Sequence, residues 1–288
     1  MRATFVLTLL VLLVAALVAG CQGAKGLQVG NIDVGALTQN LSGLKQVTEP
    51  EEIQMGKGVT ETLLGASPLT NDAQLQAYVN NVGRWVAQQS ERPNLPWHFA
   101  VNDSEVVNAA AAPGGDVIVT KGMLRVLRNE SELAGVLGHE VSHVVRKHQL
   151  IAIQKGAFMG LLAQGVQVAS QGKRNGQLVN ALVGPTKELY ARGLDKSDEF
   201  EADRMGVVIA ARAGYDAWGL PNAIQTLGTI KPDDNAVALL FKTHPPPAAR
   251  LEKLSLAMGT NFDVYASGQQ NTERYQRATQ GIRVAATK

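Results

Sequence analysis

The residues with the clearest chemical meaning form one short run, His139-Glu140-Val141-Ser142-His143. Apolar residues recur every three to four positions through this part of the chain, which predicts an amphipathic helix. Residues four apart lie on one face of a helix, so both imidazoles can bind a single metal ion. Glu140 is rotated by about 100° from His139, so its carboxylate lies beside the ion, where it can accept a proton from a metal-bound water. We expect zinc, because two imidazoles, one carboxylate and an open position are its usual catalytic set.

The ends of this helix are also predicted by the sequence. Asn129 is placed to cap its first turn, and Glu132 stands where a capping box needs an acidic residue. We expect the helix to continue to about His148. On such a helix His148 lies about 180° from His139 around the axis, so we expect it to face away from the metal and to have a structural role.

The third ligand should be a carboxylate from another helix, and an acidic turn begins a helical segment at about 197–214. Glu199 and Asp203 are four apart and therefore share a face. We expect Glu199 to bind the metal and Asp203 to accept the ring N–H of a ligand histidine. Glu201, rotated by about 200° from Glu199, is the alternative ligand. An acidic turn that only complements the helix dipole is the simpler interpretation, but the histidine pair upstream favours a metal site.

The composition limits the class of protein. The chain has 288 residues, of which 45% are hydrophobic and 18% charged, an ordinary balance for a globular protein that buries a core. Lysine and arginine total 27 against 25 acidic residues, which argues against nucleic acid as the main partner. The single cysteine excludes an intrachain disulfide and a zinc site built from several cysteines.

The N-terminus predicts export and lipid attachment. An apolar stretch over 5–19 leads into Val18-Ala19-Gly20-Cys21, which is typical of a bacterial lipoprotein signal. We expect a signal peptide over 1–20, followed by lipidated Cys21 and a flexible tether over 21–46. The predicted location is the bacterial cell envelope, anchored by lipid to the outer membrane and facing the periplasm, because Gln22 rather than Asp follows the cysteine. The inner membrane is the alternative.

The order of the remaining elements predicts a fold class. A strand at about 97–101 precedes a hairpin formed by 106–112 and 116–120, and the chain is then helical to about 229. We expect a mainly helical α+β domain over 47–258 with a small sheet of about three strands, followed by a polar tail over 259–288.

The chain resembles the HtpX and CAAX-prenyl-protease family of gluzincin zinc metallopeptidases, and most of all its lipoprotein members from the bacterial envelope. The resemblance covers roughly 97–251, and the segments that carry it are His139–His143, Glu199–Asp203 with Gly206, Asn108-Ala109 before Pro113-Gly114-Gly115, Ala213-Gly214-Tyr215-Asp216, and Thr243-His244-Pro245 with Arg250. It implies a zincin-like fold and endopeptidase activity on proteins, with His139, His143 and Glu199 as zinc ligands and Glu140 as the catalytic base.

The resemblance also places a substrate strand beside the cleft. An edge formed by 107–112 could pair with an extended peptide, with Asn108, Ala109 and Ala110 as substrate-binding residues, so we expect unfolded or misassembled envelope proteins as substrates. Ala110 stands where the family commonly has Phe, which leaves the shape of this pocket open. A purely structural hairpin is the alternative.

Two further features leave several roles open. The glycine-punctuated segment 150–187 fits either a mobile lid or a helix pair with a surface loop. His244 could stabilise the oxyanion, occupy the open metal position and keep the enzyme latent, or serve structure alone.

Two other functions compete with proteolysis. One is a chaperone-like or scaffolding lipoprotein that aids outer-membrane protein assembly and keeps a structural zinc. The other is a zinc peptidoglycan hydrolase, which is suggested by location only. Glu140 favours an enzyme, because a purely structural zinc site does not need this carboxylate.

Overall fold

The computed structural model describes residues 28–29, 32–33, 47–163 and 183–284. The chain divides into two compact units, Met1–Val47 and Thr48–Lys288. In the first unit, β1 (Gln28–Val29) and β2 (Ile32–Asp33) form an antiparallel pair. The predicted signal peptide and Cys21 lie outside the described residues, as do most of the predicted tether and residues 164–182 of the segment 150–187, which could form a lid.

The second unit contains a three-stranded mixed sheet in the order β3-β5-β4. Its strands are β3 (His98–Asn102), β4 (Ala109–Ala111) and β5 (Asp116–Thr120). β5 pairs in parallel with β3 and antiparallel with β4. The predicted hairpin and the predicted earlier strand are therefore confirmed. β4 lies at an edge of the sheet and has no second strand neighbour in the described part of the chain.

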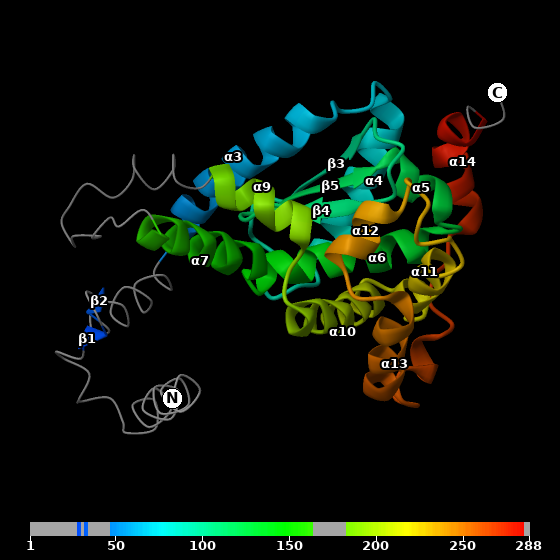
Figure 1. Cartoon of the computed structure of the whole chain (residues 1–288). Coiled ribbons are helices and arrows are strands. Elements are labelled where there is room, and N and C mark those ends of the chain that lie inside the picture. The colour runs from blue at the N-terminus through cyan, green and yellow to red at the C-terminus, as the bar shows by residue number, and fades with distance from the viewer. Residues whose placement is uncertain (1–27, 30–31, 34–46, 164–182, 285–288) are drawn as a thin grey trace. The chain divides into compact units, whose positions relative to one another are not determined.

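Helices make up most of the rest, which confirms the predicted α+β class (Figure 1). They are α3 (Glu49–Ala66), α4 (Ala73–Ala87), α5 (Lys121–Val126), α6 (Glu130–Val145), α7 (His148–Ala163), α9 (Val183–Arg192), α10 (Lys196–Arg212), α11 (Gly219–Leu227), α12 (Ala238–Thr243), α13 (Pro247–Met258) and α14 (Thr272–Val284). Among the described residues, none of these helices has both the length and the apolar character that crossing a bilayer requires.

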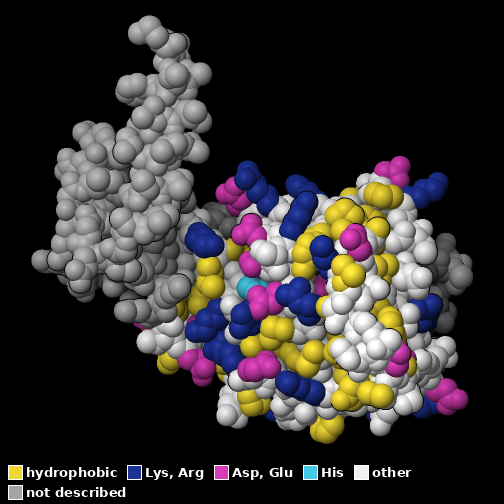
Figure 2. Space-filling view, turned by 90° about the horizontal axis from the view of Figure 1, so that it is seen from below, with side chains coloured by type: hydrophobic (Ala, Val, Ile, Leu, Met, Phe, Trp, Pro, Cys, Tyr) yellow, Lys and Arg dark blue, Asp and Glu magenta, His cyan; other side chains and the backbone are white. Residues whose placement is uncertain are grey.

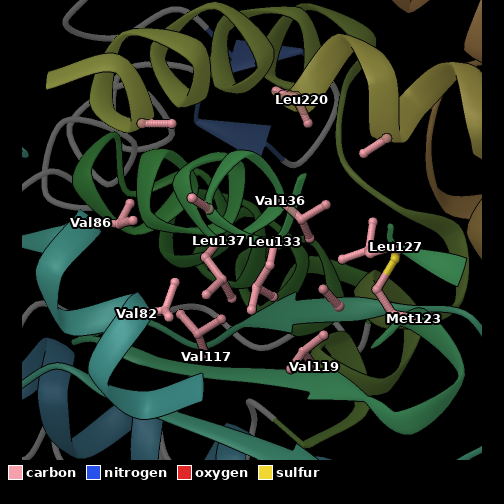
Figure 3. Close-up of a cluster of buried hydrophobic side chains, with 14 of the residues drawn as sticks. Val82, Val86, Val117, Val119, Met123, Leu127, Leu133, Val136, Leu137 and Leu220 are labelled. Carbon is pink, nitrogen blue, oxygen red and sulfur yellow. The ribbon is translucent and has the colours of Figure 1, made fainter. Parts of the chain in front are cut away.

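The core lies between one face of the sheet and helices α4 and α6 (Figure 3). Alternation along β5 turns Val117 and Val119 toward Leu133 and Leu137 of α6, and all four side chains are almost fully buried. The other sheet face carries Asp116, whose carboxylate accepts a hydrogen bond from a threonine of α3. The long, central helix α6 therefore rests directly on the sheet and is fixed along its whole length.

On the molecular face seen in Figure 2, basic and acidic side chains are interspersed and hydrophobic side chains lie scattered among them. This mixture agrees with the near-zero balance of 27 basic and 25 acidic residues in the sequence.

Both ends of α6 depart from the sequence expectation. Asn129 does accept the backbone N–H of Glu132, but the Glu132 carboxylate binds Arg128 instead of completing the capping box. At the other end the prediction that the helix continues to His148 is wrong. The helix ends at Val145, and Lys147 adopts a left-handed conformation with φ of 59°, so a new helix begins at His148 in another direction.

Helix α10 crosses α6 at unusually close range. A methyl group on Gly206 would lie 2.7 Å from the backbone nitrogen of His139, and one on Gly138 would lie 2.7 Å from the carbonyl oxygen of Gly206. The two backbones therefore touch where any larger side chain would separate them. This contact places the first turns of α10 against the histidine-bearing part of α6.

The C-terminal segment folds onto the domain, although its sequence predicted a polar tail. Tyr275 of α14 is fully buried, and its hydroxyl donates to the Leu124 carbonyl oxygen at 2.5 Å. The fully buried carboxylate of Glu130, at the start of α6, accepts hydrogen bonds from Tyr78, Tyr215 and Arg274. Burial opposes ionisation of Glu130, but these donors hold its pKa below the usual value. Glu130 thus links α4, α6 and α14 through one carboxylate.

We predict that Glu130→Gln lowers the free energy of unfolding at pH 7 by on the order of 2 kcal/mol, because it removes charge-assisted hydrogen bonds from a buried acceptor. The pKa of Glu130 is lower in the folded chain, so its stabilising effect is complete above the unfolded pKa of about 4.3 and is lost as the pH falls through the folded pKa. Urea unfolding of both proteins between pH 7 and pH 3 should show the difference shrinking toward acid.

The matched control is Glu273→Gln on α14, next to Arg274, the residue that binds Glu130. The Glu273 side chain is exposed and pairs only with Arg277 in the described structure, at 3.5 Å, so this change should cost less than about 0.5 kcal/mol. Equal losses for the two variants, or a Glu130 effect independent of pH, would contradict the assigned role.

Candidate metal centre

Three side chains from α6 and α10 converge on one point. The Nε2 atoms of His139 and His143 lie 3.0 Å apart, and each lies 3.6 Å from an oxygen of Glu199. In a tetrahedral zinc site with bonds of roughly 2.0–2.1 Å, neighbouring ligand atoms lie about 3.3 Å apart. The observed separations bracket that value. The predicted ligands are therefore brought together with spacings that fit zinc.

The surroundings of Glu199 also fit a cation. Glu199 is 2% exposed, and its Oε2 atom has no hydrogen-bond partner within the described structure. A buried carboxylate oxygen without a donor is costly, and a bound metal ion would satisfy it. Burial raises the pKa of Glu199 to about 7, which reflects the same lack of compensation.

Asp203 orients one of the histidines. Its Oδ1 atom lies 2.9 Å from Nδ1 of His139, while Arg250 binds both oxygens of Asp203, at 2.6 and 2.9 Å. Burial disfavours the charged form of Asp203, but the Arg250 guanidinium holds its pKa far below the usual value. Asp203 is thus an anionic acceptor that leaves Nε2 of His139 free for the metal. Asp203 therefore lies against His139, and its support of a metal ligand stays a prediction.

Glu140 lies beside the three ligands rather than among them. Its carboxylate belongs to a second group, with buried His139 and partly buried His244, in which the ligand-type atoms lie within 4.8 Å of one another. Burial raises the pKa of Glu140. A carboxylate at this position can exchange protons with a water held near the ligands.

His244 follows α12 and approaches the same point. Its Nε2 atom lies 3.6 Å from Oε2 of Glu199, while its Nδ1 atom lies 3.3 Å from the Leu240 carbonyl and 3.0 Å from Thr243 Oγ1. The Leu240 carbonyl can only accept, so Nδ1 must donate and Nε2 carries a lone pair. Burial, with the charge of Arg250, lowers the pKa of His244 to about 3, so the ring is neutral near pH 7.

His148 does not face away from the centre, and that expectation is wrong. Because α6 ends before it, His148 turns back, and its Nδ1 atom lies 3.0 Å from Nδ1 of His143. Glu201, the alternative ligand, lies 3.3 Å from His148 and forms an ion pair with Arg146 at 2.7 Å. It therefore lies behind His148 instead of with the metal-ligand atoms. Helical periodicity could not show either contact, because both depend on the break at Lys147.

A pocket beside these residues opens onto the edge strand β4 and is lined by Asn108, Ala109, Ala110, Glu140 and Glu199. We call it the edge-strand pocket. The side-chain oxygen of Asn108 is buried and has no hydrogen-bond partner in the described structure. The Tyr190 hydroxyl of α9 also lines this pocket and donates to the Ala111 carbonyl oxygen. No sequence pattern indicates this role for Tyr190, because the contact joins residues 79 positions apart.

A second pocket, which we call the apolar pocket, is also lined by Glu140. It shares His139, Glu140 and His244 with the metal centre, and its remaining wall is mostly aliphatic: Met123, Val136, Leu220, Ala223, Ile224 and Leu240. Such a wall favours an apolar group over a charged one next to a reacting group.

Comparison with known proteins agrees with this geometry. The chain is 29% identical over 211 residues to the beta-barrel assembly-enhancing protease of Escherichia coli K12, a match that covers 70% of this chain and 42% of that protein. It is 27% identical over 250 residues to metalloprotease YcaL of the same strain, covering 83% and 92% of the two chains. It is 30% identical over 172 residues to the mitochondrial metalloendopeptidase OMA1 of Arabidopsis thaliana, covering 59% and 33%.

The chain thus spans less than half the length of the first of these relatives. A sequence model of Peptidase family M48 matches residues 73–257, which include the two helices that carry the metal-binding side chains. These matches show the family and no finer subgroup within it. Because the match covers more than half of the 288 residues, the chain belongs to Peptidase family M48.

Proposed function

We propose that this chain is a zinc metalloendopeptidase of the bacterial cell envelope that cleaves unfolded or misassembled proteins. The observation that carries the proposal is the convergence of His139, His143 and Glu199 at spacings that fit zinc, with the Glu140 carboxylate beside them. Membership of the M48 family supports the class of reaction.

The chain's own residues have separate tasks in the proposed reaction. Zinc, when bound, supplies a Lewis acid and makes a coordinated water more acidic. Glu140 takes a proton from the attacking water and later delivers it to the leaving amine. Asp203 and Arg250 hold His139 in the correct tautomer and orientation, so the ligand set does not rearrange during the reaction.

The edge-strand pocket supports an extended, unfolded substrate. A peptide that pairs with β4 binds through its main chain, which is independent of sequence but requires an accessible, extended segment. Asn108 lines this pocket, and because its buried side-chain oxygen has no partner in the described structure, a substrate N–H that enters the pocket would satisfy it. The Tyr190 hydroxyl donates a hydrogen bond to the Ala111 carbonyl oxygen. A substrate that pairs with β4 must therefore displace this hydroxyl or bind beside it.

The envelope location rests on the sequence and on the bacterial relatives. We propose that lipidated Cys21 anchors the chain to the outer membrane and that the catalytic domain faces the periplasm. The name of the E. coli relative, beta-barrel assembly-enhancing protease, supports a role near the outer-membrane assembly machinery.

We further propose that His244 occupies the fourth metal position in the resting enzyme. Its Nδ1–H is committed to Leu240 and Thr243, so Nε2 offers a lone pair, which suits a ligand better than a hydrogen-bond donor to an oxyanion. A substrate would then have to displace His244.

The first prediction concerns Glu140. Glu140→Gln should lower casein cleavage at least about 100-fold, because the general base is lost, while zinc bound per chain stays unchanged. Elemental analysis and a casein assay on the same sample check both parts. Retained cleavage would contradict the role of Glu140, and loss of zinc would make it a ligand instead. If the variant still supports outer-membrane assembly in cells, the scaffolding alternative is favoured.

The second prediction concerns His244. His244→Ala should raise casein cleavage several-fold at unchanged zinc content, because it opens the fourth position. Replacement of the exposed His98 by Ala is the control and should leave the rate unchanged. A fall in activity would instead support oxyanion stabilisation, and no change would support a structural role.

The third prediction concerns the apolar pocket. In a peptide library, cleavage should be strongest where an aliphatic residue adjoins the scissile bond. Ala223 is fully buried in the pocket wall, so Ala223→Val should narrow the pocket and shift the preference toward Ala. Mass spectrometry of the products measures the preference. A profile dominated by charged residues, or one that the substitution leaves unaltered, would argue against this pocket as the subsite.

A further inference from the structure

A chain of polar contacts leads from the second histidine of the motif to the surface of the domain. Nδ1 of His143 meets Nδ1 of His148 at 3.0 Å, and Nε2 of His148 meets Oε2 of Glu201 at 3.3 Å. The other oxygen of Glu201 binds Arg146 at 2.7 Å. His148 is only 6% exposed, so its ring is held inside the domain.

The direction of the protons along this chain follows from the metal site. His143 can bind a metal through Nε2 only if its proton is on Nδ1. That N–H must then donate to Nδ1 of His148, which therefore accepts. The remaining proton of His148 lies on Nε2 and donates to the Glu201 carboxylate. Glu201 thus sets the tautomer of His148, and His148 sets the tautomer of His143.

The support of His143 resembles that of His139 by Asp203, with the imidazole of His148 inserted between the histidine and the carboxylate. There, an arginine holds a carboxylate that directly accepts the histidine N–H. For His143, an arginine holds the carboxylate of Glu201, and His148 bridges the distance from it. Both carboxylates come from α10, two residues apart: Asp203 contacts His139 of α6 directly, and Glu201 contacts His148 of α7, which in turn contacts His143 of α6.

The backbone supports a specific placement of His148. Lys147, which is not a glycine, adopts a φ of 59° immediately before it. Left-handed backbone is unfavourable for a residue with a side chain. An unbroken helix would avoid that cost but would carry His148 away from His143. The corner at Lys147 is what brings the two rings together.

We propose that His148 and Glu201 are positioning residues that fix the tautomer and orientation of His143 and thereby set the affinity of the metal centre. The inference rests on the proposed zinc site. Neither residue is placed as a metal ligand, because His148 contacts Nδ1 of His143, on the opposite side of the ring from Nε2, and Glu201 contacts His148.

The test is the zinc dissociation constant of the full-length protein, measured at pH 7.5 by competition with a chromophoric chelator. His148→Leu removes the acceptor while keeping an apolar volume, and it should weaken zinc binding about 10- to 100-fold. His148→Asn keeps an acceptor oxygen near the position of Nδ1 and should recover most of this loss. Glu201→Gln keeps an acceptor for His148 but removes the charge, so it should weaken binding several-fold.

Two measurements separate positioning from a merely structural role. Thermal unfolding of the metal-free proteins reports stability without the zinc site, and the visible spectrum of the cobalt-substituted proteins reports ligand geometry. We expect the cobalt spectrum of His148→Leu to change and that of His148→Asn to stay close to the wild type. His98→Leu is the matched control, because His98 also contacts a carboxylate, at 3.1 Å, but on the surface.

The possible outcomes are distinct. Zinc binding by His148→Leu within twofold of the wild type would overturn the proposal, as would equal losses in the Leu and Asn variants. If His148→Leu does not fold, the comparison of Glu201→Gln with the wild type decides in the same way. Failure of the wild type itself to bind zinc would overturn the proposed metal centre. Tight zinc binding in all variants would instead overturn only the positioning role of His148 and Glu201.

Discussion

The centre depends on the close crossing of α6 and α10. At Gly138 and Gly206 the two backbones meet with no side chain between them. Three acidic residues of α10 can reach three histidines only because the helices are this close. Glu199 meets the paired Nε2 atoms, Asp203 meets Nδ1 of His139, and Glu201 meets His148. A wider separation would leave these carboxylates buried without partners, which is costly in a protein interior.

The charges of the centre are balanced from both sides. Arg250 neutralises Asp203 inside the domain, and Arg146 pairs with Glu201 nearer the surface. Glu199 is the exception, since one of its oxygens has no donor and burial raises its pKa to about 7. The carboxylate oxygen that lacks a donor therefore belongs to Glu199, the residue expected to bind the cation. Buried carboxylates that are well satisfied, such as Glu130, serve instead to join helices.

The helix faces that carry the site residues, the hairpin and the fold class could be predicted from the sequence, because they depend on local periodicity. The four-residue spacings of His139 with His143 and of Glu199 with Asp203 placed each pair on one helix face. The hairpin and the α+β class followed from alternation and turn residues. The pairing of Glu199 with the histidines, by contrast, came from the resemblance to a family and from chemistry, since nothing local says which helices cross.

The missed features all depend on contacts made after folding. Helical periodicity places His148 on the wrong side of α6, because Lys147 adopts a left-handed conformation just after the helix ends. The contacts of Tyr190 and of Tyr275 in α14 have no local sequence pattern, because their partners, Ala111 and Leu124, lie far away in sequence. Composition alone does not distinguish a polar C-terminal segment that buries one tyrosine from a segment that stays in solvent.

The central claim is that a zinc ion lies between α6 and α10. Anomalous diffraction from crystals of the zinc-loaded protein, collected on both sides of the zinc absorption edge, tests it directly. The account predicts one strong peak at roughly 2.0–2.2 Å from Nε2 of His139, Nε2 of His143 and an oxygen of Glu199. A peak that lies elsewhere, or the absence of any peak among these three side chains, would contradict it.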